Sequence, residues 1–140
     1  MSRAIDRLLE RVPAKPLQSA RIASRLAAMT LGVIALVAGV TKFFAVGLQV
    51  EFFEYLGLSR TWMYAAAALE VFAAIQLLSP SETRRGAFVL MAVMSTAAAL
   101  HLFQGDYMFA LLPTSMIMMC ASLLGVDLVD RRARRACETC

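Results

Sequence analysis

The stretch Thr61–Leu78, TWMYAAAALEVFAAIQLL, decides the fold of this chain. It is apolar almost throughout, and it is long enough to cross the hydrocarbon core of a bilayer as a helix. One carboxylate, Glu70, lies near its middle. A charge at that depth costs several kcal/mol, so Glu70 is expected to face other helices and to have a partner. The residues one turn away from it are all alanine, which allows another helix to approach closely: Ala66, Ala67, Ala73 and Ala74.

The composition of the whole chain agrees with a membrane protein. Of its 140 residues, 60% are hydrophobic and 17% are charged, and the mean hydropathy is +0.68. Soluble domains are closer to half apolar and one quarter charged. The basic residues form short clusters between apolar runs, which is typical of membrane-flanking loops and excludes a nucleic-acid-binding stripe. One histidine and three cysteines are too few for a metal framework or a disulfide scaffold.

Four apolar runs are predicted to span the membrane. The polar and interrupted segment 45–60 lies between the first two, and it is predicted to form a short interfacial helix that ends at Gly57 and Ser59. Its buried side is expected to carry Leu48, Phe52, Tyr55 and Leu56. Short connections favour an all-α up-down bundle of four transmembrane helices. The predicted spans are residues 25–44, 61–78, 86–103 and 107–129.

The two ends of the chain are polar. Residues 3–12, RAIDRLLERV, place apolar side chains on one face and predict an amphipathic helix on the bilayer surface. Pro13 and Pro16 are expected to break this helix, so residues 1–24 are predicted to be a cytoplasmic helix and linker. The first apolar run starts too late and is too long for a signal peptide, and it is interpreted as an uncleaved span. Residues 130–140 are predicted to form a basic cytoplasmic tail.

The lysines and arginines predict the orientation. In a four-span topology, all but two of the 14 lysine and arginine residues lie on the same side of the membrane. The exceptions are Lys42 and Arg60. By the positive-inside rule, both termini are expected to be cytoplasmic.

Small residues form a stripe along the first span. The stripe repeats at spacings of three and four residues, which marks a surface for packing between helices. Lys42 follows at the same spacing and is therefore expected to point into the bundle. The stripe consists of Ala28, Gly32, Ala35 and Gly39.

Four ionisable residues are expected to share a polar pocket in the outer half of the bundle: Lys42, Glu70, His101 and Asp106. In one interpretation, Lys42 and Glu70 form an internal ion pair. Hydrogen bonds between membrane helices contribute about 0.6 kcal/mol on average, so such a pair would mainly set the register of packing. In the other interpretation, the pocket binds a polar head group, such as that of a quinone, or a small substrate, and His101 handles a proton.

The chain ends in Cys-Glu-Thr-Cys, so Cys137 and Cys140 have the spacing of a redox pair. Cytosolic thiols stay reduced, and a structural zinc ion needs four ligands, which two cysteines cannot supply. An incidental pair is the favoured interpretation, and a redox or metal role that depends on a partner is the alternative. No metal site is predicted.

Three motifs give the chain a resemblance to a known family. They are Gly39-Val40-Thr41-Lys42, Leu69-Glu70 and the segment from His101 to Gly105-Asp106. In this order and spacing, over about residues 25–125, they resemble the DoxX-like membrane proteins. The chain departs from the family pattern before Leu69-Glu70, where Ala67 and Ala68 stand in place of a frequent glycine.

The resemblance implies a four-helix integral membrane protein, and it implies a bacterial inner membrane. The family is associated with terminal oxidase and thiosulfate:quinone oxidoreductase, some relatives with membrane complexes that handle oxidative stress, and an animal branch with receptor assembly. The first hypothesis is therefore an accessory component of a membrane redox or assembly complex, without catalysis of its own. The alternatives are a quinone-binding oxidoreductase subunit and a chaperone-like interaction protein. Expected partners are the lipid bilayer and either other membrane proteins or further copies of the chain.

Overall fold

The computed structural model describes residues 14–44 and 47–138. These residues form helices and no strands, as the sequence predicted. Four of the helices contain segments long and apolar enough to cross a membrane, namely Ser19–Phe43, Arg60–Leu78, Thr83–Gln104 and Tyr107–Val129. The helices are α2 (Ala14–Phe43), α3 (Gly47–Tyr55), α4 (Arg60–Leu78), α5 (Thr83–Gln104) and α6 (Tyr107–Glu138). The amphipathic helix predicted at residues 3–12 lies outside the described residues.

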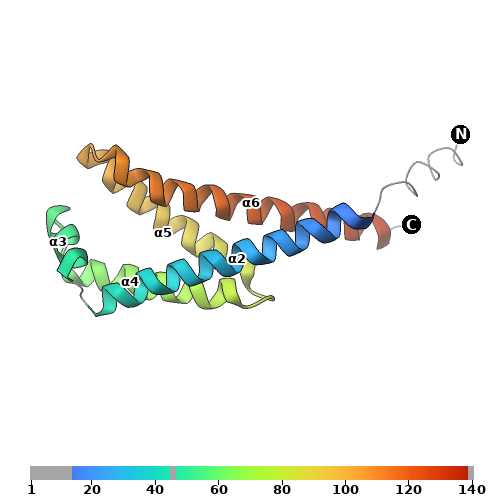
Figure 1. The fold of residues 1–140 in the computed structure, drawn as a ribbon, viewed down its shortest axis with the longest axis horizontal. Coiled ribbons are helices and arrows are strands. Elements are labelled where there is room, and N and C mark those ends of the chain that lie inside the picture. The colour runs from blue at the N-terminus through green and yellow to red at the C-terminus, as the bar shows by residue number, and fades with distance from the viewer. Residues whose placement is uncertain (1–13, 45–46, 139–140) are drawn as a thin grey trace, which may run out of the picture.

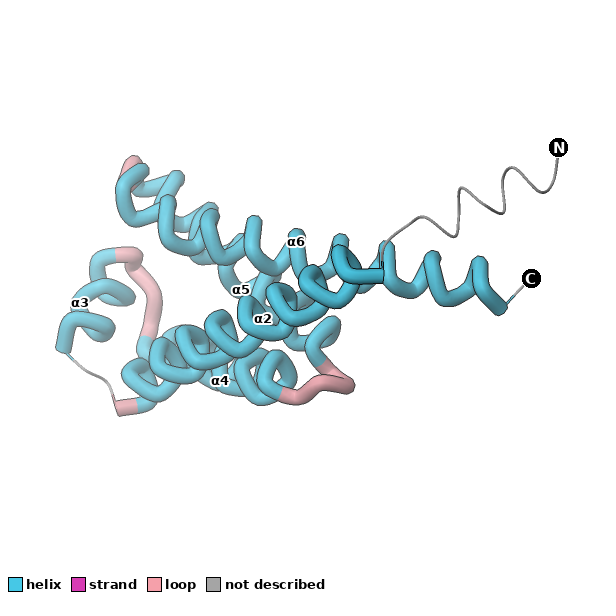
Figure 2. Tube along the Cα trace, turned by 45° about the vertical axis from the view of Figure 1, so that its right-hand side comes forward, coloured by secondary structure: helices cyan, strands magenta, loops and turns pink. Residues whose placement is uncertain are grey.

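The four long helices are arranged as two antiparallel pairs (Figure 1). Helix α2 packs along α4, and α5 packs along α6, while α4 and α5 join the pairs through a short turn. The two pairs lie close together at the end of the bundle that contains the start of α2 and the end of α6, here named the terminal end. They diverge toward the opposite end, where α3 lies, here named the α3 end (Figure 2).

The protein core is a narrow seam between the helices. Each long helix contributes mainly small or flexible apolar residues to it, which suits helices that associate by close packing inside a bilayer. Most large hydrophobic side chains lie on the outside, including Phe103, which is 90% exposed, and Leu112, which is 69% exposed. Such a surface is expected where lipid surrounds the helices. The seam includes Leu31, Ala35, Ala73, Leu77, Leu90, Met94, Met116 and Cys120.

The predicted small-residue stripe of α2 lies against α4. Ala28 and Ala35 are completely buried, and Gly32 and Gly39 are buried as well. A Cβ atom on Gly39 would lie 2.7 Å from Val71 Cγ2 and 3.0 Å from the carbonyl oxygen of Ala67. The backbones therefore approach so closely at Gly39 that no larger residue fits without movement.

Two helices are longer than the sequence predicted. Helix α2 starts at Ala14, so the segment predicted as a linker up to residue 24 is helical. Pro16 is tolerated because it lies in the first turn, where backbone N–H groups have no helical partner. Helix α6 continues to Glu138, so most of the predicted basic tail is also helical. Arginine and alanine are good helix formers, which allows the helix to continue beyond the apolar run.

Helix α3 occupies the segment predicted for an interfacial helix, and Gly57 follows it with a positive φ of 69°. The buried side differs from the expected one. Phe53 is only 8% exposed, whereas Tyr55 is 59% exposed. Glu51 and Glu54 are exposed. Successive residues of a helix are rotated by about 100° about its axis. If the buried face is rotated by less than one residue from the predicted one, Phe53 enters it and Tyr55 leaves it.

Candidate functional site

Lys42 and Glu70 form a buried ion pair between α2 and α4. The Lys42 Nζ atom lies 2.8 Å from Glu70 Oε2 and 3.0 Å from Oε1, so it donates to both carboxylate oxygens. The side chains are 12% and 4% exposed, respectively. This is the pairing that the sequence predicted for the carboxylate of the second span.

Local structure explains why these two groups meet. Lys42 lies in the last turn of α2, where the partial negative charge of the helix terminus favours a cation. One turn earlier, Gly39 allows α4 to approach. The neighbours of Glu70 on the core side of α4, Ala67, Ala73 and Ala74, are completely buried and small. The pair therefore links α2 to α4 next to a close approach of the two backbones at Gly39.

His101 lies in the last turn of α5, only 7% exposed, and contacts two aromatic rings. Its ring centroid is 4.8 Å from that of Phe52 on α3 and 6.0 Å from that of Phe109 on α6. Its Nδ1 atom is buried and has no hydrogen-bond partner among the described residues. Within the same residues, no hydrogen bond or ion pair joins His101 to Lys42 or Glu70.

Asp106 belongs to the turn between α5 and α6. Gly105 has a φ of 79°, and its N–H donates to the carbonyl oxygens of His101 and Leu102. The N–H of Asp106 donates to the carbonyl oxygen of His101 at 2.9 Å. Its own carbonyl accepts from the N–H groups of Phe109 and Ala110, which begins α6. Gly105 and Asp106 thus form the end of one helix and the start of the next.

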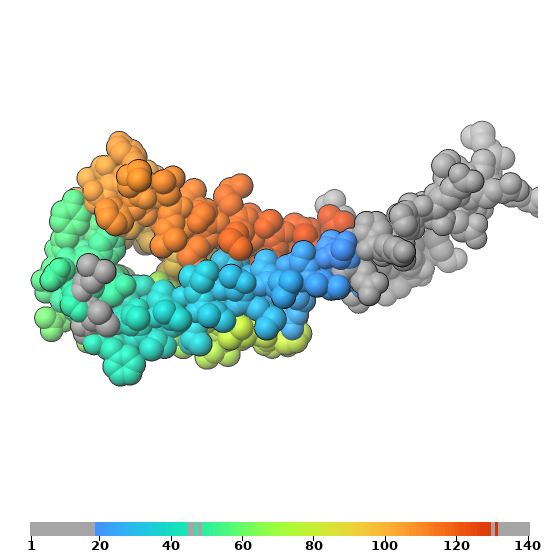
Figure 3. Space-filling model, viewed as in Figure 1, coloured from blue at the N-terminus to red at the C-terminus, as the bar shows by residue number. Residues whose placement is uncertain are grey.

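The space-filling view shows an opening between α2 and α6 near α3 (Figure 3). It results from the divergence of the two helix pairs at the α3 end. The four residues predicted to share a pocket are all near this end, but the structure joins them in two groups. Lys42 and Glu70 are paired on α2 and α4, whereas His101 and Asp106 lie on the other helix pair.

The predicted redox pair of Cys137 and Cys140 stays a prediction, because one of its two members lies outside the described residues. Cys137 lies in the last turn of α6, and Cys140 lies outside the described residues. Cys120 is a free cysteine buried in the core seam. The described residues contain no group of three or more histidine, cysteine, aspartate or glutamate side chains placed to hold a metal ion.

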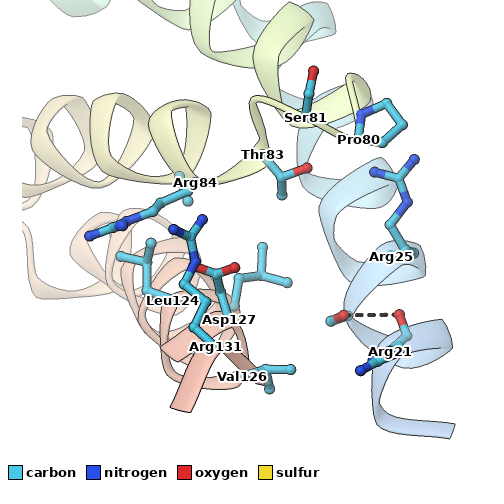
Figure 4. A pocket seen from close by; sticks show the side chains of 13 residues that line it. Arg21, Arg25, Pro80, Ser81, Thr83, Arg84, Leu124, Val126, Asp127 and Arg131 are labelled. Atoms are coloured by element: carbon cyan, nitrogen blue, oxygen red, sulfur yellow. Dashed lines mark hydrogen bonds and ion pairs between the residues drawn. The ribbon is translucent and has the colours of Figure 1, made fainter. Parts of the chain in front are cut away.

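Sequence reasoning missed a cavity at the terminal end that is lined by arginines (Figure 4). In the sequence, these arginines served only to predict orientation. Two spacings could have indicated the site, because Arg21 and Arg25, and likewise Asp127 and Arg131, are four residues apart and share a helix face.

Four apolar spans with a buried interhelical ion pair define an integral membrane protein of the helix-bundle class. Residues 26–124 match the family model of the DoxX-like family. The match covers well over half of the chain, and the chain therefore belongs to the DoxX-like family. No curated protein and no solved structure shows significant similarity to it.

Proposed function

We propose that this DoxX-like protein is an accessory component of a membrane redox or assembly complex and has no catalytic activity of its own. The observation that carries the proposal is the closed contact of Lys42 with both oxygens of Glu70. Two of the three motifs that characterise the chain meet in this pair. The third contributes Gly105 and Asp106, which form the α5–α6 turn. Most motif residues thus shape the bundle.

The energetics of the pair support a structural role. Burial of two charges in a low-dielectric environment is costly, and the cost is offset only while the groups remain paired. A substrate that used Glu70 as a base would first have to separate it from Lys42. The pair therefore holds α2 and α4 in register, and the outer surfaces of the helices are left for lipid and partner proteins.

We also propose the bacterial inner membrane as the location, with the terminal end in the cytoplasm. The unequal distribution of lysines and arginines between the two sides supports this orientation. Membership of the DoxX-like family supports the bacterial inner membrane as the location. A cysteine placed at Ser81, in the α4–α5 turn, is expected to be inaccessible to an impermeant thiol reagent in intact cells. Labelling of this cysteine in intact cells would contradict the orientation. A cysteine at Ser59, at the other end of α4, is the matched position expected to react.

A cycle of variants tests the accessory role. Tagged wild type, Lys42→Met, Glu70→Leu and the double variant are solubilised from native membranes in mild detergent, and co-purifying oxidoreductase subunits are identified and quantified. A structural pair predicts that either single change reduces recovery of the partners and that the double variant restores it. If the double variant folds as well as wild type but recovers no partner, the complex needs the two side chains themselves and not only the packing that they set, and the structural role of the pair is refuted.

A second candidate function is the binding of a quinone head group near His101. The buried Nδ1 atom without a partner supports it, because such an atom costs about 1–3 kcal/mol unless a ligand or water satisfies it. A quinone oxygen is a suitable hydrogen-bond partner, and the rings of Phe52 and Phe109 provide an apolar surface for a flat head group.

Native mass spectrometry tests this second function. The wild type is expected to retain a quinone-sized mass that His101→Phe loses, because phenylalanine keeps the ring contacts but has no nitrogen. Tyr107→Phe is the matched control, since it removes a polar group at the same end from a side chain that is 70% exposed. Equal retention by wild type and His101→Phe, or no retained quinone in the wild type, would exclude quinone binding at His101.

A further inference from the structure

A cavity of about 180 Å³ opens at the terminal end of the bundle. Its walls come from the start of α2, the turn between α4 and α5, the first residues of α5 and the last part of α6 (Figure 4). It is separate from the Lys42–Glu70 pair and from His101, which lie toward the α3 end. An inference about this cavity therefore does not depend on the proposed function.

The cavity is strongly basic. Its described lining contains four arginines and one carboxylate: Arg21, Arg25, Arg84, Arg131 and Asp127. Asp127 offsets one of these charges, because its Oδ2 atom lies 2.9 Å from Arg131 Nε. The positive charge of the described lining thus exceeds its negative charge even when this pair is formed.

Arg25 is the most informative of these residues. Its side chain extends from α2 toward Pro80 in the α4–α5 turn (Figure 4). Its Nη1 atom is buried and has no hydrogen-bond partner among the described residues. A buried guanidinium N–H group without an acceptor is energetically unfavourable. An acceptor from outside the described residues, such as a ligand, would remove this cost.

Arg84 supplies a second guanidinium without a carboxylate partner in the described part of the chain. Its Cζ atom lies 5.7 Å from the centre of the Phe88 ring, so the side chain rests on an aromatic face. The hydroxyl groups in the lining contribute less, because Ser24 donates to the carbonyl oxygen of Arg21 and Thr83 donates to that of Ser79. Recognition in this cavity rests on guanidinium groups.

Guanidinium groups select planar or tetrahedral oxyanions, and a phosphate group accepts several of their N–H donors at once. The arginines on α2 and α5 lie in the first two turns of their spans, and Asp127 lies in the last turn of its span. These positions correspond to the head-group layer of a bilayer. Basic pockets between membrane helices at this depth are suited to the phosphate of an anionic lipid.

We propose that the cavity among Arg21, Arg25, Arg84 and Arg131 is a binding site for a phosphate group. Two sources share this chemistry. One is the head group of an anionic phospholipid that enters from the bilayer, and the other is a free phosphate that enters from the aqueous side.

The test uses the purified full chain in mild detergent. The thermal unfolding midpoint is measured while short-chain phosphatidylglycerol is added, and it is measured separately with inorganic phosphate against chloride at equal ionic strength. Short-chain phosphatidylcholine, whose choline offsets the phosphate charge, is the lipid control. Stabilisation by phosphatidylglycerol alone identifies a lipid head-group site, and stabilisation by inorganic phosphate as well identifies a site open to free phosphate.

Variants show whether the response arises in the cavity. Arg25→Gln is expected to weaken the apparent affinity about tenfold, the effect of losing one charge-assisted contact. Arg85→Gln is the matched control, because Arg85 follows Arg84 of the lining in sequence and carries the same charge as Arg25, but it is exposed and donates to Glu82 at 2.8 Å. It is expected to bind like the wild type.

A second variant, which removes a negative charge instead of a positive one, keeps the test valid if Arg25→Gln fails to fold. Asp127→Asn removes the one described carboxylate of the lining and is expected to raise the apparent affinity. Three results would overturn the proposal: no stabilisation by phosphatidylglycerol or phosphate, equal stabilisation by phosphatidylcholine, or equal affinity losses in Arg25→Gln and Arg85→Gln. Unchanged or weaker binding by Asp127→Asn would also contradict it.

Discussion

The two ends of the bundle handle charge in opposite ways. At the α3 end, one ammonium and one carboxylate are buried together on adjacent helices, and each satisfies the other. At the terminal end, four arginines share a cavity with one aspartate in its described lining. Balanced charge inside a membrane protein sets how helices pack, whereas unbalanced charge at a membrane surface is available to an external partner.

The largest expected effect comes from breaking the balanced pair. Lys42→Met should lower the free energy of unfolding by about 3 kcal/mol, because it leaves the Glu70 carboxylate buried without its cation. The double variant Lys42→Met/Glu70→Leu should recover to within about 1 kcal/mol of wild type. Denaturation by sodium dodecyl sulfate, followed by circular dichroism, measures both. A double variant as unstable as the worse single variant would refute the closed-pair interpretation.

The close contact that supports the pair gives the next effect. Gly39→Leu should lower the free energy of unfolding by about 2 kcal/mol, because a side chain there meets Val71 and the backbone of Ala67. Gly125→Leu is the control, since a Cβ atom at Gly125 has no neighbour within 4 Å. The same denaturation assay should show no loss for Gly125→Leu. Equal losses in both variants would mean that α2 and α4 are not closely packed at Gly39.

A smaller effect is expected at His101. The change His101→Phe should raise the free energy of unfolding by about 1 kcal/mol, because it removes a buried Nδ1 atom that has no hydrogen-bond partner among the described residues. Thermal unfolding of the ligand-free protein is the measurement. A loss of stability comparable to that of Lys42→Met would show that His101 makes a polar contact essential to the fold. His101 would then resemble the Lys42–Glu70 pair in its contribution to stability.

The smallest effect is expected for an exposed pair near the same end. Arg60 and Glu54 lie 3.9 Å apart, and their side chains are 67% and 62% exposed. Arg60→Ala should change the free energy of unfolding by about 0.3 kcal/mol, because water screens exposed pairs. Arg60→Ala and Lys42→Met each remove the cation of an ion pair, so comparing their losses of stability in one assay shows the effect of burial on the strength of the pair. Equal losses would show that burial does not determine the strength of these pairs.

Patterns along the sequence predicted the features that depend on local spacing. The length and apolar character of the spans predicted four helices, and the stripe that ends at Lys42 placed its ammonium toward Glu70. The ends of α2 and α6 could not be predicted in the same way. The end of an apolar run marks where the helix leaves the lipid, not where the helix itself ends. Pro16 and the arginines after Asp130 are compatible with helix outside the lipid, so they do not mark its ends.

Contacts that depend on how the helices cross could not be predicted from the sequence. The Phe52 ring meets His101 because α3, which packs on α4 and α2, brings it to the end of α5, and the Phe109 ring meets His101 across the α5–α6 turn. Likewise, counting charges assigned Arg25 and Arg84 to one side of the membrane, but it could not show that they line one cavity. These features depend on crossing geometry, which periodicity within a single helix does not encode.

The continuity of α6 has a mechanical consequence. Its spanning part ends at Val129, but the helix continues to Glu138. At a rise of 1.5 Å per residue, this extension is a stiff arm about 14 Å long. A protein bound to the arm would sense the rotation and tilt of the bundle inside the bilayer. Inserting one alanine after Val129 would turn the arm by about 100° while lengthening it by only about 1.5 Å, so the arm's orientation can be changed almost independently of its reach.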